Sequence, residues 1–155
     1  MKLYAKSGRY IQGLATFDEV KAIVDKIPKE EHKYFYTGEN FTDSPYVIYR
    51  NVKYILKNNT KYGAFVEVYS DMDSDQPDED IGYITVVAEP EARGTGITDT
   101  LVKDAISNME AMQIHSLYWE CDADNKGSVK LAERTGFKLD KKYSTHDYVV
   151  YVYNI

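Results

Sequence analysis

Residues 81–122 contain a strand, a glycine turn, a helix and a second strand in immediate succession, and this order limits the fold more than any other feature. The two strands are predicted over 81–89 and 116–122, where β-branched and aromatic residues are frequent. Between them, apolar residues recur with helical spacing: Ile97, Leu101, Val102, Ala105, Ile106, Met109 and Met112. A strand that returns through a helix to a second strand makes a parallel pair, so part of the sheet is predicted to be parallel.

The residues before this crossover follow a period of two. Strand-forming residues are frequent in three segments that turn-forming residues separate: 46–58, 62–70 and 81–89. They predict an antiparallel meander, so the sheet as a whole is mixed and the fold class is mixed α/β. A first strand is predicted over 2–6 and a last one over 148–154.

Two further helices complete the predicted elements. Thr16 and Glu19 form a capping box that opens a helix, and Pro28 ends it. Residues 29–45 show no clear period and predict a short helix plus a loop. Another short helix is predicted over 128–136.

Size and charge limit the number of domains and the classes of partner that the chain can bind. With 155 residues, of which 43% are apolar, the chain can bury one core, so residues 1–155 are predicted to form a single domain. The net charge of −6 argues against a general nucleic-acid or anionic-membrane binder, because such proteins need basic surfaces. No run approaches the roughly 20 apolar residues that cross a bilayer. Cys121 is the only cysteine, so no internal disulfide can form, and we expect a cytoplasmic protein with a packed thiol.

The glycine turn, EARGTGITDT at 91–100, predicts an anion site. A helix N-terminus presents unpaired backbone N–H groups, and glycines let the chain approach a phosphate closely. The alternative is that Gly94 and Gly96 only make a tight turn. The sequence lacks the P-loop pattern GxxxxGK[ST], and the dinucleotide pattern GxGxxG fails because its third glycine falls on Asp99. Asp122, at the end of the next strand, keeps a dinucleotide site as an alternative.

The turn and a second block of the chain match one known pattern. The stretch RGTGIT at 93–98 resembles the R/Q-x-x-G-x-G/A signature of the GCN5-related N-acetyltransferase (GNAT) superfamily. The stretch DADNKGSVKLAERTGFK at 122–138 is similar to a block of its ribosomal-protein N-terminal acetyltransferase branch. The two blocks and the segment between them cover residues 81–138. The resemblance implies a GNAT-like fold, in which helices flank a mixed sheet with splayed middle strands.

The resemblance also implies acetyl-CoA as the cofactor. The splayed strands would leave a gap in which the pantetheine arm bonds to backbone groups of Val86, Val87 and Ala88. The pyrophosphate would lie on the backbone amides of Arg93, Gly94, Thr95, Gly96, Ile97 and Thr98. Asn125 would bond to the pantetheine region. Thr98 stands where the family has glycine or alanine, which crowds the turn but adds a hydroxyl donor.

Three residues are candidates for proton transfer. The tyrosine with which many family members protonate the leaving thiolate falls on Ala132, so that donor is absent. Ser128 occupies the position that the ribosomal branch is thought to use instead; the alternative is that it only caps the helix it begins. Asp80 or Glu67 is the candidate base for the amine, whose proton must leave before attack. The alternative for both carboxylates is a solvated charge at the sheet edge.

The remaining polar clusters indicate no metal site. The loop 71–80 holds six acidic residues, but Gln76 and Gly82 stand where a calcium-binding loop needs glycine and glutamate. The three histidines have no metal-ligand spacing. The fifteen tyrosines are attributed to core and sheet-face positions.

We therefore expect an acetyltransferase that moves an acetyl group from acetyl-CoA to a primary amine by direct attack, without a metal. The acidic balance favours a neutral or cationic acceptor, either a peptide or protein N-terminus or a small amine. A homodimer is also expected. Two alternatives stay open: a CoA-binding regulatory or interaction module that has lost catalysis, and a dinucleotide-binding oxidoreductase.

Overall fold

The computed structural model describes residues 2–4, 10–12, 15–34, 43–44, 46–70 and 80–155. The strands of its main sheet are β3 (Val47–Lys57), β4 (Thr60–Ser70), β5 (Ile81–Ala88), β6 (Ser116–Asp122), β7 (Lys138–Leu139) and β8 (Tyr148–Asn154). The helices are α1 (Phe17–Val24), α2 (Ile97–Ser107), α3 (Met109–Met112) and α4 (Lys126–Arg134), with the 3-10 helices η1 (Lys29–Tyr34) and η3 (Pro90–Ala92). The strand order in the main sheet is β3-β4-β5-β6-β8-β7.

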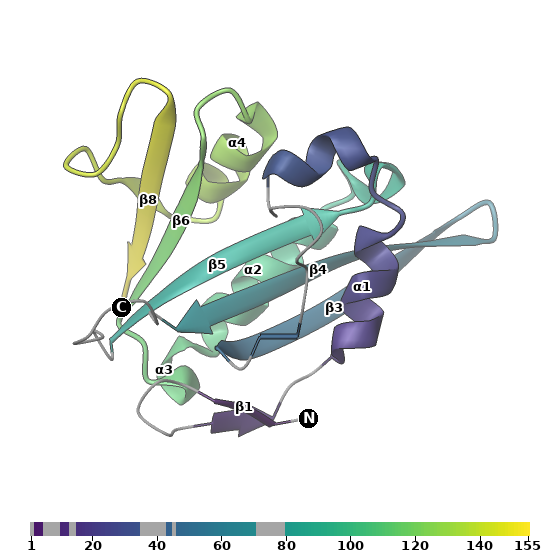
Figure 1. Ribbon diagram of the computed structural model, residues 1–155, viewed down its shortest axis with the longest axis horizontal. Helices are drawn as coiled ribbons and strands as arrows, with labels where there is room; N and C mark the ends of the chain where they lie inside the picture. Colours follow the sequence, from purple (N-terminus) through teal and green to yellow (C-terminus); the bar gives the residue numbers. More distant parts are fainter. Residues whose placement is uncertain (1, 5–9, 13–14, 35–42, 45, 71–79) are drawn as a thin grey trace.

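The predicted mixed sheet is confirmed. β3, β4 and β5 pair antiparallel in chain order, β5 and β6 pair parallel, and β8 pairs antiparallel with both β6 and β7. The return from β5 to the parallel strand β6 runs through α2 and α3, as the order of the elements in the sequence predicts. Figure 1 views the sheet from the face that carries α1, with α2 behind it.

The two middle strands separate along their length, as the family resemblance implies. β5 pairs with β6 only at Ile81, Gly82 and Tyr83, whose partners are Ser116, Leu117 and Tyr118. Beyond the last pair, Tyr83 with Tyr118, the two strands diverge (Figure 1). β5 nevertheless stays paired with β4 as far as Ala88, and β6 stays paired with β8 as far as Asp122. We call the last pair the vertex and the space between the diverging strands the gap.

Helices cover both faces of the sheet, because successive strand residues point to opposite sides. Ala64 and Val66 of β4 join Leu101 of α2 in the larger core. Phe65 of β4 points the other way and joins Ile23 of α1 in a smaller core. The meander therefore has an α2 face and an α1 face.

The capping box of α1 is confirmed, but the helix is shorter than predicted. Thr16 Oγ1 accepts a hydrogen bond from the Glu19 N–H, and Glu19 Oε1 accepts one from the Thr16 N–H, both at 3.2 Å. α1 ends at Val24 rather than at Pro28. A proline disfavours helical geometry in the residue before it, and Ile27 N–H instead bonds to Val24 O in a tighter turn.

The other differences are local. β1 (Lys2–Tyr4) pairs with β2 (Tyr10–Gln12) in a separate two-stranded sheet, and β2 has no counterpart in the prediction. The predicted long helix breaks at Asn108, because Asn108 Nδ2 and Ser107 Oγ both donate to Asp104 O at 2.7 Å. Such side-chain bonds compete with the helical backbone bond, so α2 ends there and α3 follows.

Three short segments complete the comparison. The helix predicted within 29–45 is η1. The rest of that segment, apart from 43–44, lies outside the described residues, as do residues 5–6 of the first predicted strand. β7 is two residues long and is not predicted.

We predict that Gly82→Val lowers the free energy of unfolding by about 1–3 kcal/mol. A Cβ at this position would lie 2.6 Å from Ile114 Cδ1 and 3.1 Å from Val68 Cγ1, next to the vertex. Urea unfolding followed by circular dichroism measures the change. Gly127→Ala in α4 is the control, since a Cβ there meets no atom within 4 Å. Equal stability of the two variants would contradict this close packing.

Candidate functional site

A glycine turn joins the open end of β5 to α2. Gly94 has φ 75° and Gly96 has φ 85°, a backbone region that favours glycine. A Cβ at either position would meet no protein atom within 4 Å. The glycines therefore serve the backbone rather than the packing, and the space in front of them is open.

The first turn of α2 supplies backbone donors at this point. The N-cap, Gly96, has no side chain, so no cap accepts a hydrogen bond from the N–H groups of the first turn. Thr98 is partly buried. Thr95 Oγ1 donates to Ala92 O at 2.5 Å and so holds the turn closed on itself. These features suit the binding of an anion by backbone groups.

Side chains fix the turn to the rest of the fold. Arg93 Nε and Nη2 donate to Ala88 O at 3.3 and 3.2 Å, and Nη2 also lies 2.8 Å from Glu31 Oε1 in η1. The buried Glu89 carboxylate accepts from Gly63 N–H in β4 at 2.5 Å. The Arg93 side chain thus points back to the protein, and its backbone N–H donates to Pro90 O at 3.2 Å.

The predicted pantetheine-binding residues lie on the gap. Val86, Val87 and Ala88 follow the vertex on β5, where one strand edge is occupied by β4 and the other faces the gap. A strand edge carries backbone donors and acceptors that need partners. The structure thereby brings these three residues together with the turn at 93–98, at one end of the gap.

An ion pair joins the helices beside the gap. Arg134, in the last turn of α4, reaches Asp99 in the first turn of α2 through Nε–Oδ2 at 2.7 Å and Nη2–Oδ1 at 2.9 Å. The hydrogen bonds from Arg134 lower the pKa of Asp99. This two-pronged contact holds α4 next to the glycine turn.

Asn125 caps α4, in place of Ser128, which the sequence offers as the cap. α4 begins at Lys126, not at Ser128, and its N-cap is Asn125. Asn125 Oδ1 accepts from the Ser128 N–H at 3.4 Å. The alternative that Ser128 is the cap is therefore wrong, because Ser128 lies inside the first turn.

The Ser128 hydroxyl is held by a side chain instead. Trp119 Nε1 in β6 donates to Ser128 Oγ at 2.8 Å. Trp119 directly follows the vertex residue Tyr118, so Ser128 lies close to the start of the gap, on the α2 face. Cys121 is buried nearby, as expected of a packed thiol. Burial raises the pKa of the Cys121 thiol, against the opposing hydrogen bond from Ser128.

The two candidate bases lie in different places. Asp80 is exposed, and its carbonyl accepts from the N–H groups of His115 and Ser116 at the closed end of the strand pair. Glu67 pairs with Thr85, two residues beyond the vertex. Of the two, the structure brings Glu67 beside the gap, on the α1 face.

Glu67 belongs to a buried polar cluster. Its side chain is 2% exposed, Tyr69 Oη donates to Oε2 at 2.7 Å, and Arg50 Nε lies 3.6 Å from Oε1. Arg50 is also buried and bonds to Asp43 Oδ1 at 3.2 Å. Burial raises the pKa of the Glu67 carboxyl, and Arg50 and Tyr69 oppose that shift. The solvated edge charge considered for Glu67 is therefore wrong.

Trp119 and Arg50 have no role in the prediction from sequence. The period-two pattern of β6 puts Trp119 and Cys121 on one face, a signal that could have linked Trp119 to the following helix. Arg50 faces Glu67 only because of the β3–β4 register. Alternation alone does not specify that register.

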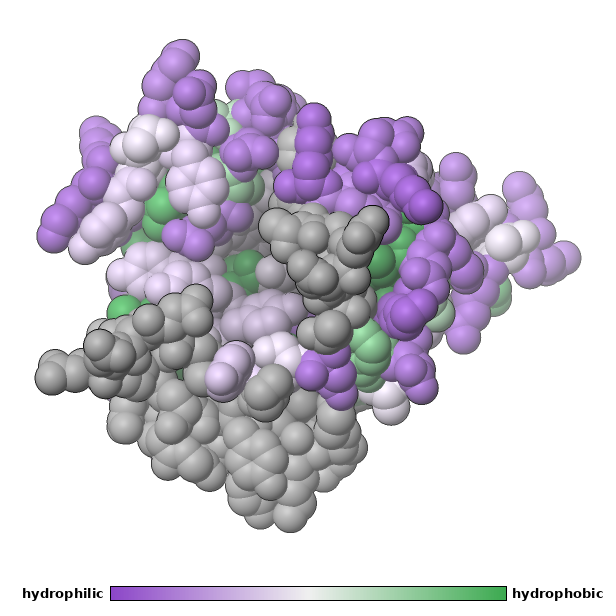
Figure 2. Space-filling model, viewed as in Figure 1, coloured by the Kyte–Doolittle hydropathy of each residue, from purple (hydrophilic) through white to green (hydrophobic). Residues whose placement is uncertain are grey.

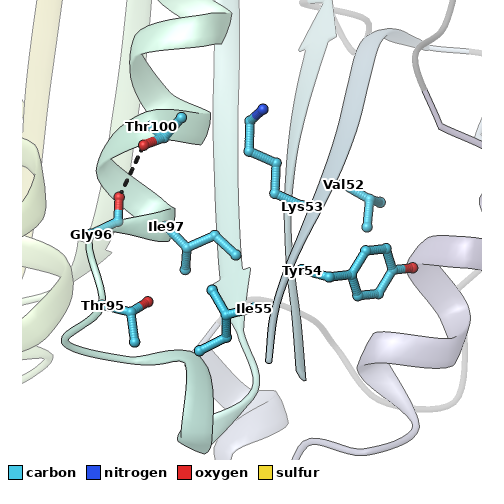
Figure 3. A pocket seen from close by; sticks show the side chains of 8 residues that line it. All are labelled: Val52, Lys53, Tyr54, Ile55, Thr95, Gly96, Ile97 and Thr100. Carbon is cyan, nitrogen blue, oxygen red and sulfur yellow. Dashed lines mark hydrogen bonds between the residues drawn. The ribbon is translucent and has the colours of Figure 1, made fainter. Parts of the chain in front are cut away.

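A separate pocket of about 570 Å³ lies between β3 and α2 (Figure 3). Its lining residues are Val52, Lys53, Tyr54, Ile55, Thr95, Gly96, Ile97 and Thr100. Lys53 Nζ lies 3.5 Å from Asp104 Oδ2, so this pocket is on the side of α2 that faces β3. The Asp99–Arg134 pair is on the side that faces α4. The pocket and the gap are thus different spaces that share the glycine turn.

Within the described ranges, no three histidine, cysteine, aspartate or glutamate side chains gather in a way that would hold a metal ion. Within the same ranges, none of the helices has the length and apolar character needed to span a membrane. Residues 71–79 of the acidic loop lie outside the described residues.

Comparisons with solved structures show the same fold. The GNAT domain of S. lividans PAT is 12% identical, with 100% of this chain and 96% of that chain covered and a TM-score of 0.69. RimL, a ribosomal L7/L12 alpha-N-protein acetyltransferase in complex with coenzyme A, is 16% identical, with 92% of each chain covered and a TM-score of 0.62. The ribosomal-protein-alanine N-acetyltransferase from Brucella melitensis is 18% identical, with 68% of this chain and 69% of that chain covered and a TM-score of 0.54.

Sequence comparison identifies the family. No curated protein gives a significant match to the sequence. A family model described as "Acetyltransferase (GNAT) family" matches residues 20–137, which is most of the chain and includes the first block that carries the resemblance and all but the last residue of the second. The protein therefore belongs to the GNAT family of acetyltransferases.

Proposed function

We propose that the protein transfers the acetyl group of acetyl-CoA to a primary amine by direct attack. The observation that carries the proposal is the gap itself, which starts at the Tyr83–Tyr118 vertex and leads to an open glycine turn with backbone donors. The open edge of β5 suits an extended chain with amide groups, and the turn suits the phosphates at its end. The coenzyme A bound to the structurally similar RimL supports this choice of cofactor.

The cofactor would lie along β5 from the turn toward the vertex. The backbone of Val86, Val87 and Ala88 would pair with the pantetheine arm, in the way that a neighbouring strand would. The amides of residues 93–98 would hold the pyrophosphate. Asn125 uses Oδ1 to cap α4, which leaves its Nδ2 as the donor for a pantetheine carbonyl. The thioester would then lie near the vertex.

The transfer itself needs two proton movements. The amine nitrogen attacks the thioester carbonyl carbon, the carbon–sulfur bond breaks, the nitrogen loses one proton and the sulfur gains one. Groups from opposite sheet faces are available for these steps. Ser128 comes from the α2 face and Glu67 from the α1 face.

Ser128 is the proposed donor to the leaving thiolate. Its oxygen accepts from Trp119 Nε1, which polarises the hydroxyl as a donor, and its hydrogen, which bonds to the Cys121 thiol, would turn to the leaving thiolate. Ala132, the position of the tyrosine in many family members, is fully buried in the core. The absence of that tyrosine is also what favours the alternative of a CoA-binding module without catalysis.

Glu67 is the proposed base. An alkyl amine with a pKa near 10.4 costs roughly 4–5 kcal/mol to deprotonate at pH 7, and a base reduces this cost. Because Glu67 is buried, it would take the proton through one water molecule rather than by direct contact. Its raised pKa makes it a better proton acceptor than an exposed carboxylate. Asp80, at the closed end of the strands, is the alternative base.

We predict that Gly96→Glu abolishes coenzyme A binding. Added atoms at this position project into the open space in front of the turn, and the carboxylate would repel the phosphates. Calorimetry of coenzyme A binding measures the loss, with folding checked by circular dichroism. Gly96→Ala is the matched control, because it carries the same backbone strain at φ 85° without the bulk and charge. Unchanged affinity in a folded Gly96→Glu variant would remove the cofactor site from this turn.

We predict that Ser128→Ala lowers kcat by roughly 10²-fold, the usual effect of losing a general acid, and leaves acetyl-CoA affinity unchanged. The measurement is steady-state transfer to an amine together with calorimetry. Ser107→Ala is the control, since that hydroxyl bonds only to Asp104 O at the far end of α2. A normal kcat would leave Ser128 as a packing partner of Trp119. The absence of transfer by the unaltered protein, with coenzyme A still bound, would instead support the module without catalysis.

We predict that Glu67→Gln changes the pH dependence of both stability and activity. Because the folded pKa is raised, Glu67 stabilises the fold at low pH, and this contribution is lost as the pH rises through the folded pKa. Stability of the unaltered protein relative to Glu67→Gln should therefore fall as the pH rises above about 4.5.

The activity of Glu67→Gln should be reduced at pH 7 and recover toward the pKa of the amine, where no base is needed. Urea unfolding at several pH values and pH–rate profiles measure the two effects. A larger loss of kcat in Asp80→Asn than in Glu67→Gln would transfer the base role to Asp80.

A further inference from the structure

Three tyrosines lie side by side across the vertex on the α1 face. The strand register pairs Tyr69 of β4 with Tyr83 of β5, and Tyr83 with Tyr118 of β6. Paired residues on neighbouring strands point to the same face of a sheet. The ring centroids of Tyr83 and Tyr118 are 5.9 Å apart, and all three side chains are partly exposed. We call these residues the tyrosine row.

A carboxylate follows the row on β6. Glu120 is two residues beyond Tyr118, so it points to the same face and borders the gap. It is exposed, unlike Glu67, which is buried against Arg50 on the other side of the gap. Tyr148 of β8 lies beside it: burial, followed by the charge of Glu120, raises the pKa of Tyr148 to about 12.

Figure 2 views the same face of the molecule. In Figure 2, mildly hydrophilic residues occupy the middle of the face, and strongly hydrophilic residues border it above. Aromatic rings next to a carboxylate attract organic cations, because the ring faces and the carboxylate are both negative. An acidic acceptor would meet repulsion from the same groups.

We propose that the tyrosine row and Glu120 form the acceptor subsite, and that it takes a primary amine carrying a second cationic group. The inference rests on the proposed function, which puts the thioester at the vertex. The amine that attacks must be neutral, so it cannot itself use the attraction of the rings and the carboxylate at the moment of reaction. A second amine on the same acceptor, protonated at pH 7, can use it.

The attacking nitrogen would lie at the vertex, beside Tyr118, and the second cation at Glu120, so the distance between these two residues sets the size of the acceptor. Two residues along β6 separate Tyr118 from Glu120, which corresponds to about 7 Å. An aliphatic chain of about four carbons between two nitrogens spans that length. A small diamine and a peptide with a basic side chain share this chemistry, and both are tested below.

The experiment compares acceptors of equal size with and without the second charge. The small pair is 1,4-diaminobutane and 1-aminopentane. The peptide pair carries lysine or norleucine at the second position. At saturating acetyl-CoA, we expect kcat/KM to favour the charged member by about tenfold, as one cation–π contact and one partly exposed charge pair would give. The pair with the larger ratio of kcat/KM values shows whether the acceptor is a small diamine or a peptide.

Variants assign the preference to residues. Glu120→Gln and Tyr118→Leu should each reduce it severalfold by raising KM for the charged acceptor, with kcat and acetyl-CoA affinity preserved. Tyr118→Phe should retain most of it, because the ring remains. Glu110→Gln on α3 removes an exposed carboxylate elsewhere and should have no effect. Glu120 is exposed, so its variant tests the proposal even if Tyr118→Leu is unstable.

Direct binding separates this inference from the proposed function. Calorimetry measures 1,4-diaminobutane binding to the protein with coenzyme A bound, for the unaltered chain and for Glu120→Gln. Transfer with equal kcat/KM for both members of each pair would overturn the subsite and leave the acetyltransferase function standing. Glu120-dependent diamine binding without transfer to any amine would support the subsite and overturn the function. No diamine binding by the unaltered chain would also overturn the subsite.

Discussion

Two intact ladders hold apart a pair of strands that begin as neighbours. β5 keeps its bonds to β4, and β6 keeps its bonds to β8, while the contact between β5 and β6 stops at Tyr83 and Tyr118. The open edge of β5 therefore cannot close onto β6 without breaking another ladder. Buried backbone groups need partners, so such an edge is stable only if water or a ligand satisfies it. The site of this protein depends on that unsatisfied edge.

The two faces of the sheet bring different chemistry to the gap. On the α2 face, α4 places Ser128 against Trp119 and ties itself to α2 through Arg134 and Asp99. On the α1 face, the tyrosine row and the Glu67–Arg50 pair lie beside the same opening. The proposed reaction uses this separation, because the leaving thiolate and the incoming amine need opposite proton movements. A proton donor and a proton acceptor that lie on opposite faces of the sheet do not exchange protons directly with each other.

The sequence predicts the parts of this arrangement that depend on periodicity and on backbone conformation. The meander, the crossover helix and the need for glycine at positions 94 and 96 follow from residue types alone. What it does not predict depends on register and on contacts between distant segments. Arg50 opposite Glu67 and Trp119 against Ser128 are two such contacts. The tyrosine row is not predicted for a similar reason. Alternation places each tyrosine on a face of the sheet, but only the strand register shows that the three are paired across neighbouring strands.

The position of Arg93 has a consequence for how the two substrates influence one another. Its backbone belongs to the turn proposed for the pyrophosphate, and its guanidinium joins Ala88 O at the end of β5 to Glu31 in η1, the element that follows α1. A ligand that shifts this turn would displace η1 through the Arg93–Glu31 ion pair, and a ligand that shifts η1 would displace the turn through the same contact. Such coupling is reciprocal by thermodynamic necessity. If the first substrate raises the affinity for the second by some factor, the second raises the affinity for the first by the same factor. The Arg93 side chain would therefore link the affinities of the two proposed substrates, in whichever order they bind.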